Sequence, residues 1–216
     1  MILQTEREKV VKYLNLLIEK GLTKGTGGNI SIYNEEKGLV AISPSSIPYD
    51  KLTPYDIMVV DLDGNVVDGN PDYKPSSETG MHLSAYRERK DFKAFIHTHA
   101  MYCTTIACLR ESLKAVDYMI AIAGTNEVKC AEYAMYGTPE LAKNATEAIR
   151  GAKACLLANH GVNVGAEDIE NAFAITEYVE FCAELYVKAK SIGEPVILPK
   201  EEIDRHIEKF GSYCKL

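Results

Sequence analysis

The chain has 216 residues, of which 46% are hydrophobic, and its formal net charge is -7. This length and composition favour one globular domain with a sizeable core, and the acidic balance argues against a nucleic-acid-binding surface, which needs clustered Lys and Arg. Residues 1–8 are charged where a signal peptide would be apolar, and the longest apolar stretch, 115–124, is too short to cross a bilayer. Six cysteines lie scattered without a CxxC pair, which favours reduced thiols. We therefore expect a cytoplasmic protein without membrane or nucleic-acid partners.

The first predicted element is an amphipathic helix that begins at the capping-box pattern Thr5-x-x-Glu8 and ends at Gly21. A glycine-rich loop at 25–29 follows it. Short strands separated by polar turns are then predicted over 30–33, 39–42, 57–60 and 66–67. The last two form a hairpin around Asp63-Gly64-Asn65.

The second half of the chain alternates buried strands with helices. Apolar strands are predicted over 92–99, 128–131 and 154–158. Capping residues and helical spacing predict helices that start near 75–78 and cover 101–109, 138–151, 166–191 and 201–210, with a tail at 211–216. The expected fold class is α/β, with one domain over 1–216 and a central mixed sheet covered by helices on both faces.

Three of the five histidines fall at predicted strand ends. His97 and His99 are two residues apart, so both imidazoles can reach one point, and His160 follows the strand at 154–158. An HxH pair alone is more often two hydrogen-bonded structural histidines, but a third histidine favours a metal site. Three neutral imidazoles with an open position are the catalytic pattern for zinc. We predict Zn²⁺ bound by these three residues; His82 is expected to pack behind or support the site, and His206 to lie on a solvated helix.

Several motifs resemble those of the class II aldolase/adducin family. The segments around His97 and His160, His97-Thr98-His99-Ala100 and Asn159-His160-Gly161-Val162, are similar to two family signatures, and Pro75-Ser76-Ser77-Glu78 is similar to a third. Further similar segments lie in order along the chain, at 25–31, 43–49, 117–121, 136–141 and 209–213. The resemblance implies a largely antiparallel sheet and a homotetramer with active sites between subunits.

The reaction that this resemblance implies is reversible cleavage of a ketose 1-phosphate, with L-fuculose 1-phosphate as the expected substrate. The products would be dihydroxyacetone phosphate and L-lactaldehyde. The ion, with Co²⁺ or Mn²⁺ as substitutes for Zn²⁺, would stabilise negative charge on the substrate oxygens. Glu78 is the expected base, with a pKa raised by a dry site, although without substrate it could bind the ion instead.

The phosphate is expected to bind where backbone N–H groups and hydroxyls gather, in the glycine-rich loop and at the helix start near Glu78. The candidate residues are Thr26, Gly28, Asn29, Ser45, Ser46, Ser76 and Ser77. The family has Thr-Gly where this chain has Ser45-Ser46. The resemblance further implies that Tyr118 protonates the aldehyde oxygen from a neighbouring subunit, that Tyr136 forms an aromatic wall, and that Tyr213 closes over the site.

Three other functions remain open. An aldolase acting on 5-deoxyribulose or 5-methylthioribulose 1-phosphate would share the whole site, because one methyl or thioether changes binding by only roughly 1–3 kcal/mol. L-ribulose-5-phosphate 4-epimerase has the same fold but carries Asp where this chain has Glu78. A non-catalytic, adducin-like interaction module would lack the metal ligands.

Overall fold

A computed structural model describes residues 1–213, with side chains described through Gly211. Residues 214–216 of the predicted tail lie outside the described residues, and so does the side chain of Tyr213. Tyr213 is the last residue of a helix rather than part of a tail.

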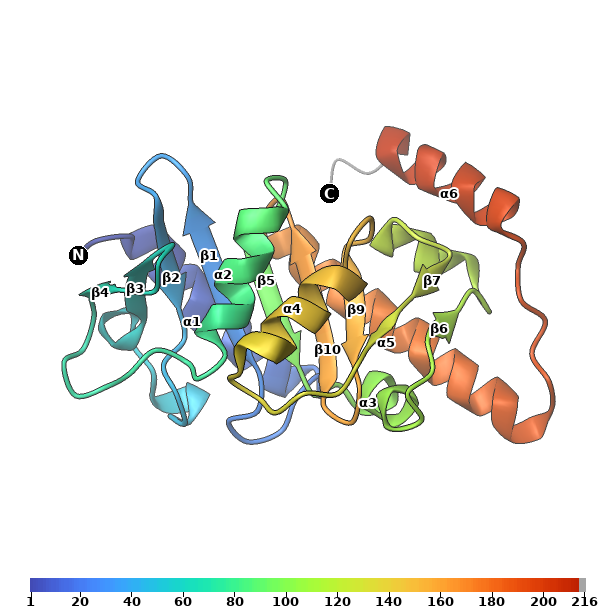
Figure 1. Cartoon of the computed structure of the whole chain (residues 1–216), viewed down its shortest axis with the longest axis horizontal. Helices are drawn as coiled ribbons and strands as arrows, with labels where there is room; N and C mark the ends of the chain where they lie inside the picture. The colour runs from blue at the N-terminus through green and yellow to red at the C-terminus, as the bar shows by residue number, and fades with distance from the viewer. Residues whose placement is uncertain (214–216) are drawn as a thin grey trace.

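An eight-stranded sheet forms the centre of the fold (Figure 1). In spatial order its strands are β4 (Val66–Asp68), β3 (Met58–Asp61), β2 (Leu39–Ile42), β1 (Asn29–Asn34), β5 (Ala94–Thr98), β10 (Gly161–Ala166), β9 (Ala154–Leu157) and β8 (Cys130–Ala131). Neighbouring strands pair antiparallel except for β8 and β9, which are parallel. The predicted mixed, largely antiparallel sheet is therefore confirmed.

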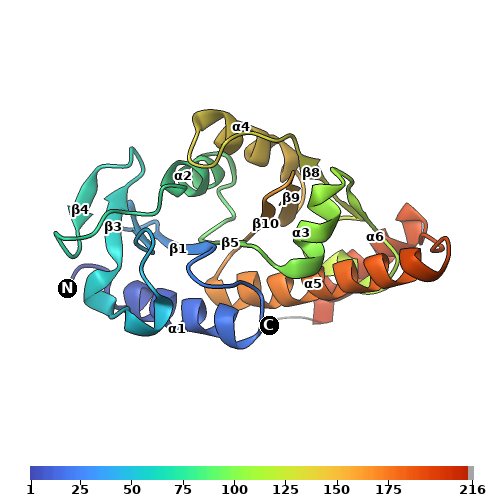
Figure 2. The same ribbon diagram turned by 90° about the horizontal axis from the view of Figure 1, so that it is seen from below.

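Helices cover both faces of this sheet (Figure 2). On one face lie α1 (Gln4–Glu19) and α5 (Ile169–Ile192), with α3 (Met101–Cys108) packed on α5, and on the other lie α2 (Thr79–Glu88) and α4 (Pro139–Ala148). Because alternate strand residues point to opposite faces, each face has its own core. In β5, Ala94 and Ile96 belong to the core on the α1 and α5 side, whereas Phe95 belongs to the core on the α2 and α4 side.

Smaller elements complete the chain. Two single-turn helices, η1 (Tyr49–Lys51) and η2 (Pro54–Asp56), precede β3, and a two-stranded sheet joins β6 (Leu113–Lys114) to β7 (Glu127–Val128). Between these two strands lies η3 (Tyr118–Ala123), on which the final helix α6 (Lys200–Tyr213) packs. Within the described residues, no helix combines the length and apolar character needed to cross a membrane.

The largest error in the sequence-based elements is the missing strand β10. Its sequence, Gly161–Ala166, contains two glycines, which weaken a strand signal. Packing explains both: a Cβ on Gly161 would lie 2.4 Å from Thr98 O, and one on Gly165 would lie 2.4 Å from the Phe92 ring. The helix predicted from 166 consequently starts later, at Ile169, where the Asp168 side chain accepts a hydrogen bond from Asn171 N.

Other boundaries and short elements also differ from the predictions. The strand expected over 92–99 is shorter in the structure, Ala94–Thr98, and the one expected over 128–131 is divided between β7 and β8, which belong to different sheets. The short elements β6 and η3 were not predicted, because two to six residues carry too little periodicity to identify an element from sequence.

Candidate active site

A row of three residues across the middle of the sheet forms the base of the candidate site. His97 of β5 lies opposite Asn29 of β1 and Asn163 of β10, and all three are buried. Asn163 Oδ1 lies 2.9 Å from His97 Nδ1. Because an amide oxygen can only accept, Nδ1 holds the ring proton and Nε2 keeps its lone pair free. Asn163 was missed because the strand that carries it was missed.

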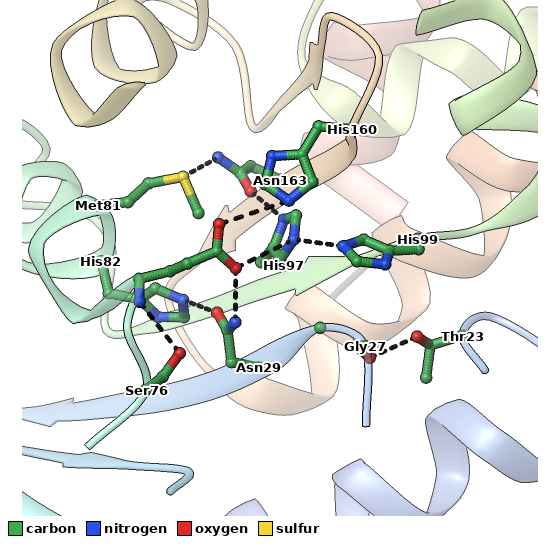
Figure 3. A network of polar contacts seen from close by, with 12 residues as sticks. Thr23, Gly27, Asn29, Ser76, Met81, His82, His97, His99, His160 and Asn163 are labelled. Carbon is green, nitrogen blue, oxygen red and sulfur yellow. Dashed lines mark hydrogen bonds and ion pairs between the residues drawn. The ribbon is translucent and has the colours of Figure 1, made fainter. Parts of the chain in front are cut away.

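The other two histidines come from the ends of strands. His99 follows β5, and His160 precedes β10 after Asn159, whose φ of 55° turns the chain between β9 and β10. Figure 3 shows the three imidazoles turned toward one another. His97 Nε2 and His99 Nε2 are 3.1 Å apart, and one ligand nitrogen from each of the three rings lies within 4.8 Å of the others.

Burial keeps these three rings neutral. It lowers the pKa of His97 to about 4, although the neighbouring Glu78 carboxylate opposes the shift, and burial also lowers the pKa of His99 and His160. Neutral imidazole is the form that binds metal ions. At neutral pH the three rings therefore present lone pairs, without first having to lose protons.

Glu78 lies beside this histidine group at the N-cap position of α2. Its Oε2 is 3.4 Å from His97 Nε2, and its Oε1 is 3.5 Å from His160 Nε2. Oε1 is buried and has no hydrogen-bond partner among the described residues, an arrangement that a bound cation would satisfy. Three imidazole nitrogens with an adjacent carboxylate oxygen fit the donor set that zinc takes in proteins.

The pKa of Glu78 differs from the sequence-based expectation. Burial by itself would raise it, but attraction from His97 and a hydrogen bond from Asn29 Nδ2, 2.9 Å from Oε2, outweigh burial and lower the pKa. The side chain is therefore a carboxylate at neutral pH, able to accept a proton. The Asn29 amide, expected to bind phosphate, is in this structure a hydrogen-bond partner of Glu78.

His99, His160 and Glu78 open onto a cavity of about 310 Å³. The predicted phosphate-binding residues all line it, together with the predicted wall residue: Thr26, Gly28, Asn29, Ser45, Ser46, Ser76, Ser77 and Tyr136. Two backbone hydrogen bonds, Ser76 N to Ser43 O and Ser45 N to Lys74 O, both 3.0 Å, hold the two serine loops side by side. Among the described residues, the lining contains no lysine or arginine.

Hydroxyl groups that were not predicted from the sequence form hydrogen bonds with carbonyl oxygens of the glycine-rich loop. Tyr49 Oη lies 2.9 Å from Gly27 O and 2.7 Å from Gly28 O, and the Thr23 hydroxyl also donates to Gly27 O. In a trans peptide the C=O and the next N–H point in opposite directions, so the Gly28 N–H points away from Tyr49. Gly28 itself has a φ of +89°, and a Cβ there would lie 2.6 Å from His97 O. Only glycine fits this position.

Ser46 keeps a conformation that glycine usually adopts. Its φ of 63° lies in the left-handed region, which a serine enters at some energetic cost. The departure from the family's Thr-Gly therefore does not change the direction of the loop.

Tyr118 is not brought to this cavity within its own chain. Its side chain is 45% exposed, and its ring centroid lies 4.9 Å from that of His206 and 6.4 Å from that of Phe210, both in α6. The expectation of a solvated His206 is corrected by the same contact. Local sequence patterns do not predict this packing, because Tyr118 and α6 are far apart in the chain.

A histidine group that could hold a metal ion, a buried carboxylate and a hydroxyl-lined cavity on an antiparallel α/β sheet are features of a metal-dependent enzyme. Residues 8–187 match the family model for the Class II Aldolase and Adducin N-terminal domain, and the chain belongs to this family. Class II aldolases are metal-dependent, in agreement with the group formed by His97, His99 and His160.

Several relatives are similar over nearly their whole length. The chain is 51% identical over 213 residues to 5-deoxy-D-ribulose 1-phosphate aldolase of Bacillus thuringiensis serovar kurstaki, and the aligned region covers 99% of both chains. It is 40% identical over 194 residues to L-fuculose phosphate aldolase of Escherichia coli K12, and the aligned region covers 89% of this chain and 88% of the relative. A solved structure of an L-fuculose 1-phosphate aldolase superposes with a TM-score of 0.93 at 51% identity, covering 96% of both chains. The fold and the family expected from the sequence are thus confirmed.

Proposed function

We propose that this protein is a zinc-dependent aldolase that reversibly cleaves a ketose 1-phosphate to dihydroxyacetone phosphate and a short aldehyde, and that residues 1–216 act as one catalytic domain. The observation that carries the proposal is that neutral His99 and His160, the Glu78 carboxylate and the serine loops line one cavity. Relatives named as sugar-phosphate aldolases, at 40% and 51% identity, support it.

The groups in the cavity match the needs of aldol chemistry. An ion held by His97, His99 and His160 would supply Lewis-acid stabilisation of the negative charge that develops on the substrate oxygens, with Co²⁺ or Mn²⁺ as substitutes for Zn²⁺. In the direction of synthesis, Glu78, held as a carboxylate, takes a proton from the carbon beside the carbonyl of dihydroxyacetone phosphate. In the direction of cleavage it returns this proton. Its free Oε1 is the oxygen available for this transfer, because Oε2 accepts from Asn29.

The phosphate is bound in this cavity by neutral donors. Ser45, Ser46, Ser77 and Gly28 all line it, and the N-terminus of α2 adds a partial positive charge. With no lysine or arginine among the described lining residues, hydrogen bonds with defined directions carry the recognition. A ketose without phosphate should therefore bind weakly.

Three ketose phosphates are candidate substrates. L-fuculose 1-phosphate would give L-lactaldehyde, and 5-deoxyribulose 1-phosphate would give acetaldehyde, which is shorter by one CHOH unit. 5-Methylthioribulose 1-phosphate would give methylthioacetaldehyde. The two named relatives support one candidate each. A site that hydrogen-bonds the extra hydroxyl would discriminate strongly between these aldehydes, whereas a purely apolar pocket would discriminate weakly.

The test is an aldehyde screen. The zinc-loaded protein is incubated with dihydroxyacetone phosphate and, separately, L-lactaldehyde, acetaldehyde and methylthioacetaldehyde, and the ketose phosphate products are quantified. Unphosphorylated dihydroxyacetone and metal-stripped protein are the controls, and both should give little product. If none of the aldehydes forms a carbon–carbon bond with dihydroxyacetone phosphate, the proposed aldolase activity is refuted. Epimerisation of L-ribulose 5-phosphate in a parallel assay would instead establish the epimerase.

We further propose a homotetramer in which Tyr118 of one subunit completes the cavity of the next as the proton donor to the aldehyde oxygen. Tyr118 is 45% exposed and does not line its own cavity, and Tyr136 at the cavity wall is 61% exposed. Exposed aromatic side chains on both surfaces suit a contact between copies of the chain. Tyr213 would close over the site from α6.

A further inference from the structure

A buried polar chain runs behind Glu78, away from the cavity. His82 lies at its centre and is fully buried, and both of its ring nitrogens are bonded. Nε2 contacts Asn29 Oδ1 (Figure 3), and Nδ1 lies 2.7 Å from Ser31 Oγ. Asn29 connects this ring to Glu78, and Tyr86 lies at the far end, with its hydroxyl 2.7 Å from Ser31 Oγ. The catalytic proposal for Glu78 uses its contact with Asn29 but not His82, Ser31 or Tyr86.

The spacing of the residues explains how the chain forms. Glu78, His82 and Tyr86 are four residues apart along α2, so they share one face of the helix. Asn29 and Ser31 are two residues apart in β1 and point to the same face of the sheet. Four helical residues span about 6 Å and two strand residues span about 6.7 Å. These nearly equal spacings keep the three residues of α2 in register with Asn29 and Ser31 where α2 lies over β1.

The partners fix the direction of the hydrogen bonds. A carboxylate can only accept, so Asn29 presents its NH₂ to Glu78 and therefore its oxygen to His82. His82 must then hold its proton on Nε2, and its bare Nδ1 accepts from the Ser31 hydroxyl. Ser31, His82 and Asn29 thus all donate toward Glu78.

His82 remains neutral in this position. Burial, with repulsion from His97, lowers the pKa of His82 to about 3. A neutral ring with one proton has a single way to satisfy both neighbours. The amide of Asn29 would otherwise be free to turn over and present its oxygen to the carboxylate, which would repel it.

We propose that His82 is a positioning residue that acts through Asn29: it locks the Asn29 amide with its NH₂ on Glu78 Oε2 and so leaves Oε1 turned toward His160 and the cavity. This inference rests on the proposed role of Glu78 in proton transfer. The competing explanation is packing alone, since the His82 ring also lies edge-on to Phe95 with centroids 4.9 Å apart.

Two substitutions separate positioning from packing. His82→Gln can place an N–H near the position of Nε2, whereas His82→Asn places its amide only near the position of Nδ1. We expect His82→Asn to lower kcat about 10- to 100-fold with a change of less than about 3-fold in the KM for dihydroxyacetone phosphate, because misplacement of a catalytic group acts on the reacting step. His82→Gln should recover most of the loss. Solvent exchange of the dihydroxyacetone phosphate C–H proton should follow kcat.

Leu83→Ala is the matched control, because Leu83 neighbours His82 on α2 and is equally buried in the core. It should lower the melting temperature without the selective loss in kcat, and zinc content should be the same in all variants. Equal losses in the Gln and Asn variants, or kcat values within about 3-fold of wild type for both, would overturn the proposal.

A measurement on the wild-type protein keeps the inference testable if the variants do not fold, and does not depend on which reaction the protein catalyses. With ¹⁵N-labelled histidine, NMR should find His82 as the neutral Nε2–H tautomer, with a slowly exchanging ring N–H that does not change between about pH 6 and 8. A neutral Nδ1–H tautomer or a cationic ring would overturn the proposed direction of the chain. Aldolase activity absent from wild type, with this signal present, would refute the proposed function alone.

Discussion

At the scale of single residues, Glu78 lies in an environment that opposes and supports its charge at the same time. Burial disfavours the carboxylate, while His97 and Asn29 favour it, and the balance lowers its pKa. One of its oxygens is hydrogen-bonded and the other has no partner among the described residues. A charged group kept partly unsatisfied is suited to accept a proton or to contact a cation.

The first prediction concerns this carboxylate. Glu78→Gln keeps the size of the side chain but cannot accept a proton, so we expect turnover to fall by about 10² to 10⁴. Exchange of the dihydroxyacetone phosphate C–H proton with solvent should fall in parallel, as measured by NMR in D₂O. Metal content measured on the same sample would show whether the histidine site is intact. Unchanged exchange would mean that another group is the base.

A second prediction concerns stability and pH. Burial alone would raise the pKa of Asp56, but hydrogen bonds from Asn70 and Thr53 outweigh it and lower the pKa. A lowered folded-state pKa stabilises the protein above the unfolded pKa of about 3.9, and this stabilisation is lost as pH falls through the folded pKa.

We therefore expect Asp56→Asn to lower the free energy of unfolding by about 1–2 kcal/mol at pH 7, and by clearly less below about pH 4. Urea unfolding of both proteins at the two pH values measures the difference. If Asp56→Asn lowers the free energy of unfolding by the same amount in acid, the charge of Asp56 is not what stabilises η2.

At the scale of elements, the loop at 25–29 is rigid because a neighbouring element holds its carbonyl groups. Tyr49, in η1, is buried, and its hydroxyl contacts Gly27 O and Gly28 O at 2.9 and 2.7 Å. Burial, together with the Glu78 charge, raises the pKa of Tyr49, so it remains a donor. The peptide planes are thereby fixed with the Gly28 N–H on the opposite side.

The third prediction follows from this contact. Tyr49→Phe removes one hydroxyl and should raise the KM for dihydroxyacetone phosphate about 10-fold, which corresponds to about 1.4 kcal/mol, with a smaller change in kcat. Tyr55→Phe makes the same chemical change at a side chain that is 52% exposed and serves as the control. If both substitutions leave the KM unchanged, Tyr49 does not orient the loop for phosphate.

At the scale of the whole molecule, Tyr118, the proposed proton donor, packs on α6 and is not among the described residues that line the cavity of its own chain. A tetramer with heterologous contacts would place the same surface of each subunit against the next cavity. Oligomerisation would then be needed for activity as well as for stability.

The fourth prediction tests this arrangement by mixing. Glu78→Gln protein and Tyr118→Phe protein, each of low activity, are unfolded together and co-assembled. Activity should return, because some cavities would then have an intact Glu78 from one subunit and an intact Tyr118 from another. Hybrid tetramers, confirmed by mass spectrometry, that stay as inactive as their parents would place Tyr118 in its own subunit's site or outside catalysis.

The types of the main elements and the identity of the polar residues around the cavity could be predicted from local sequence patterns. Strand and helix periodicity depends on local spacing, and motifs such as Pro75-Ser76-Ser77-Glu78 are continuous in the chain. The histidine group could be predicted for the same reason, since two ligands are two residues apart and the third lies at a strand end.

The contacts between these residues depend on the folded arrangement of the chain. It introduced β10, whose glycines are explained by contacts with Thr98 and Phe92 that no local pattern contains. It showed that Asn29, predicted to bind phosphate, is a hydrogen-bond partner of Glu78, and it connected His82 to that carboxylate through the register between α2 and β1. Hydrogen bonds between residues about 50 positions apart depend on how a helix lies on a sheet, and the packing of both cores fixes that placement.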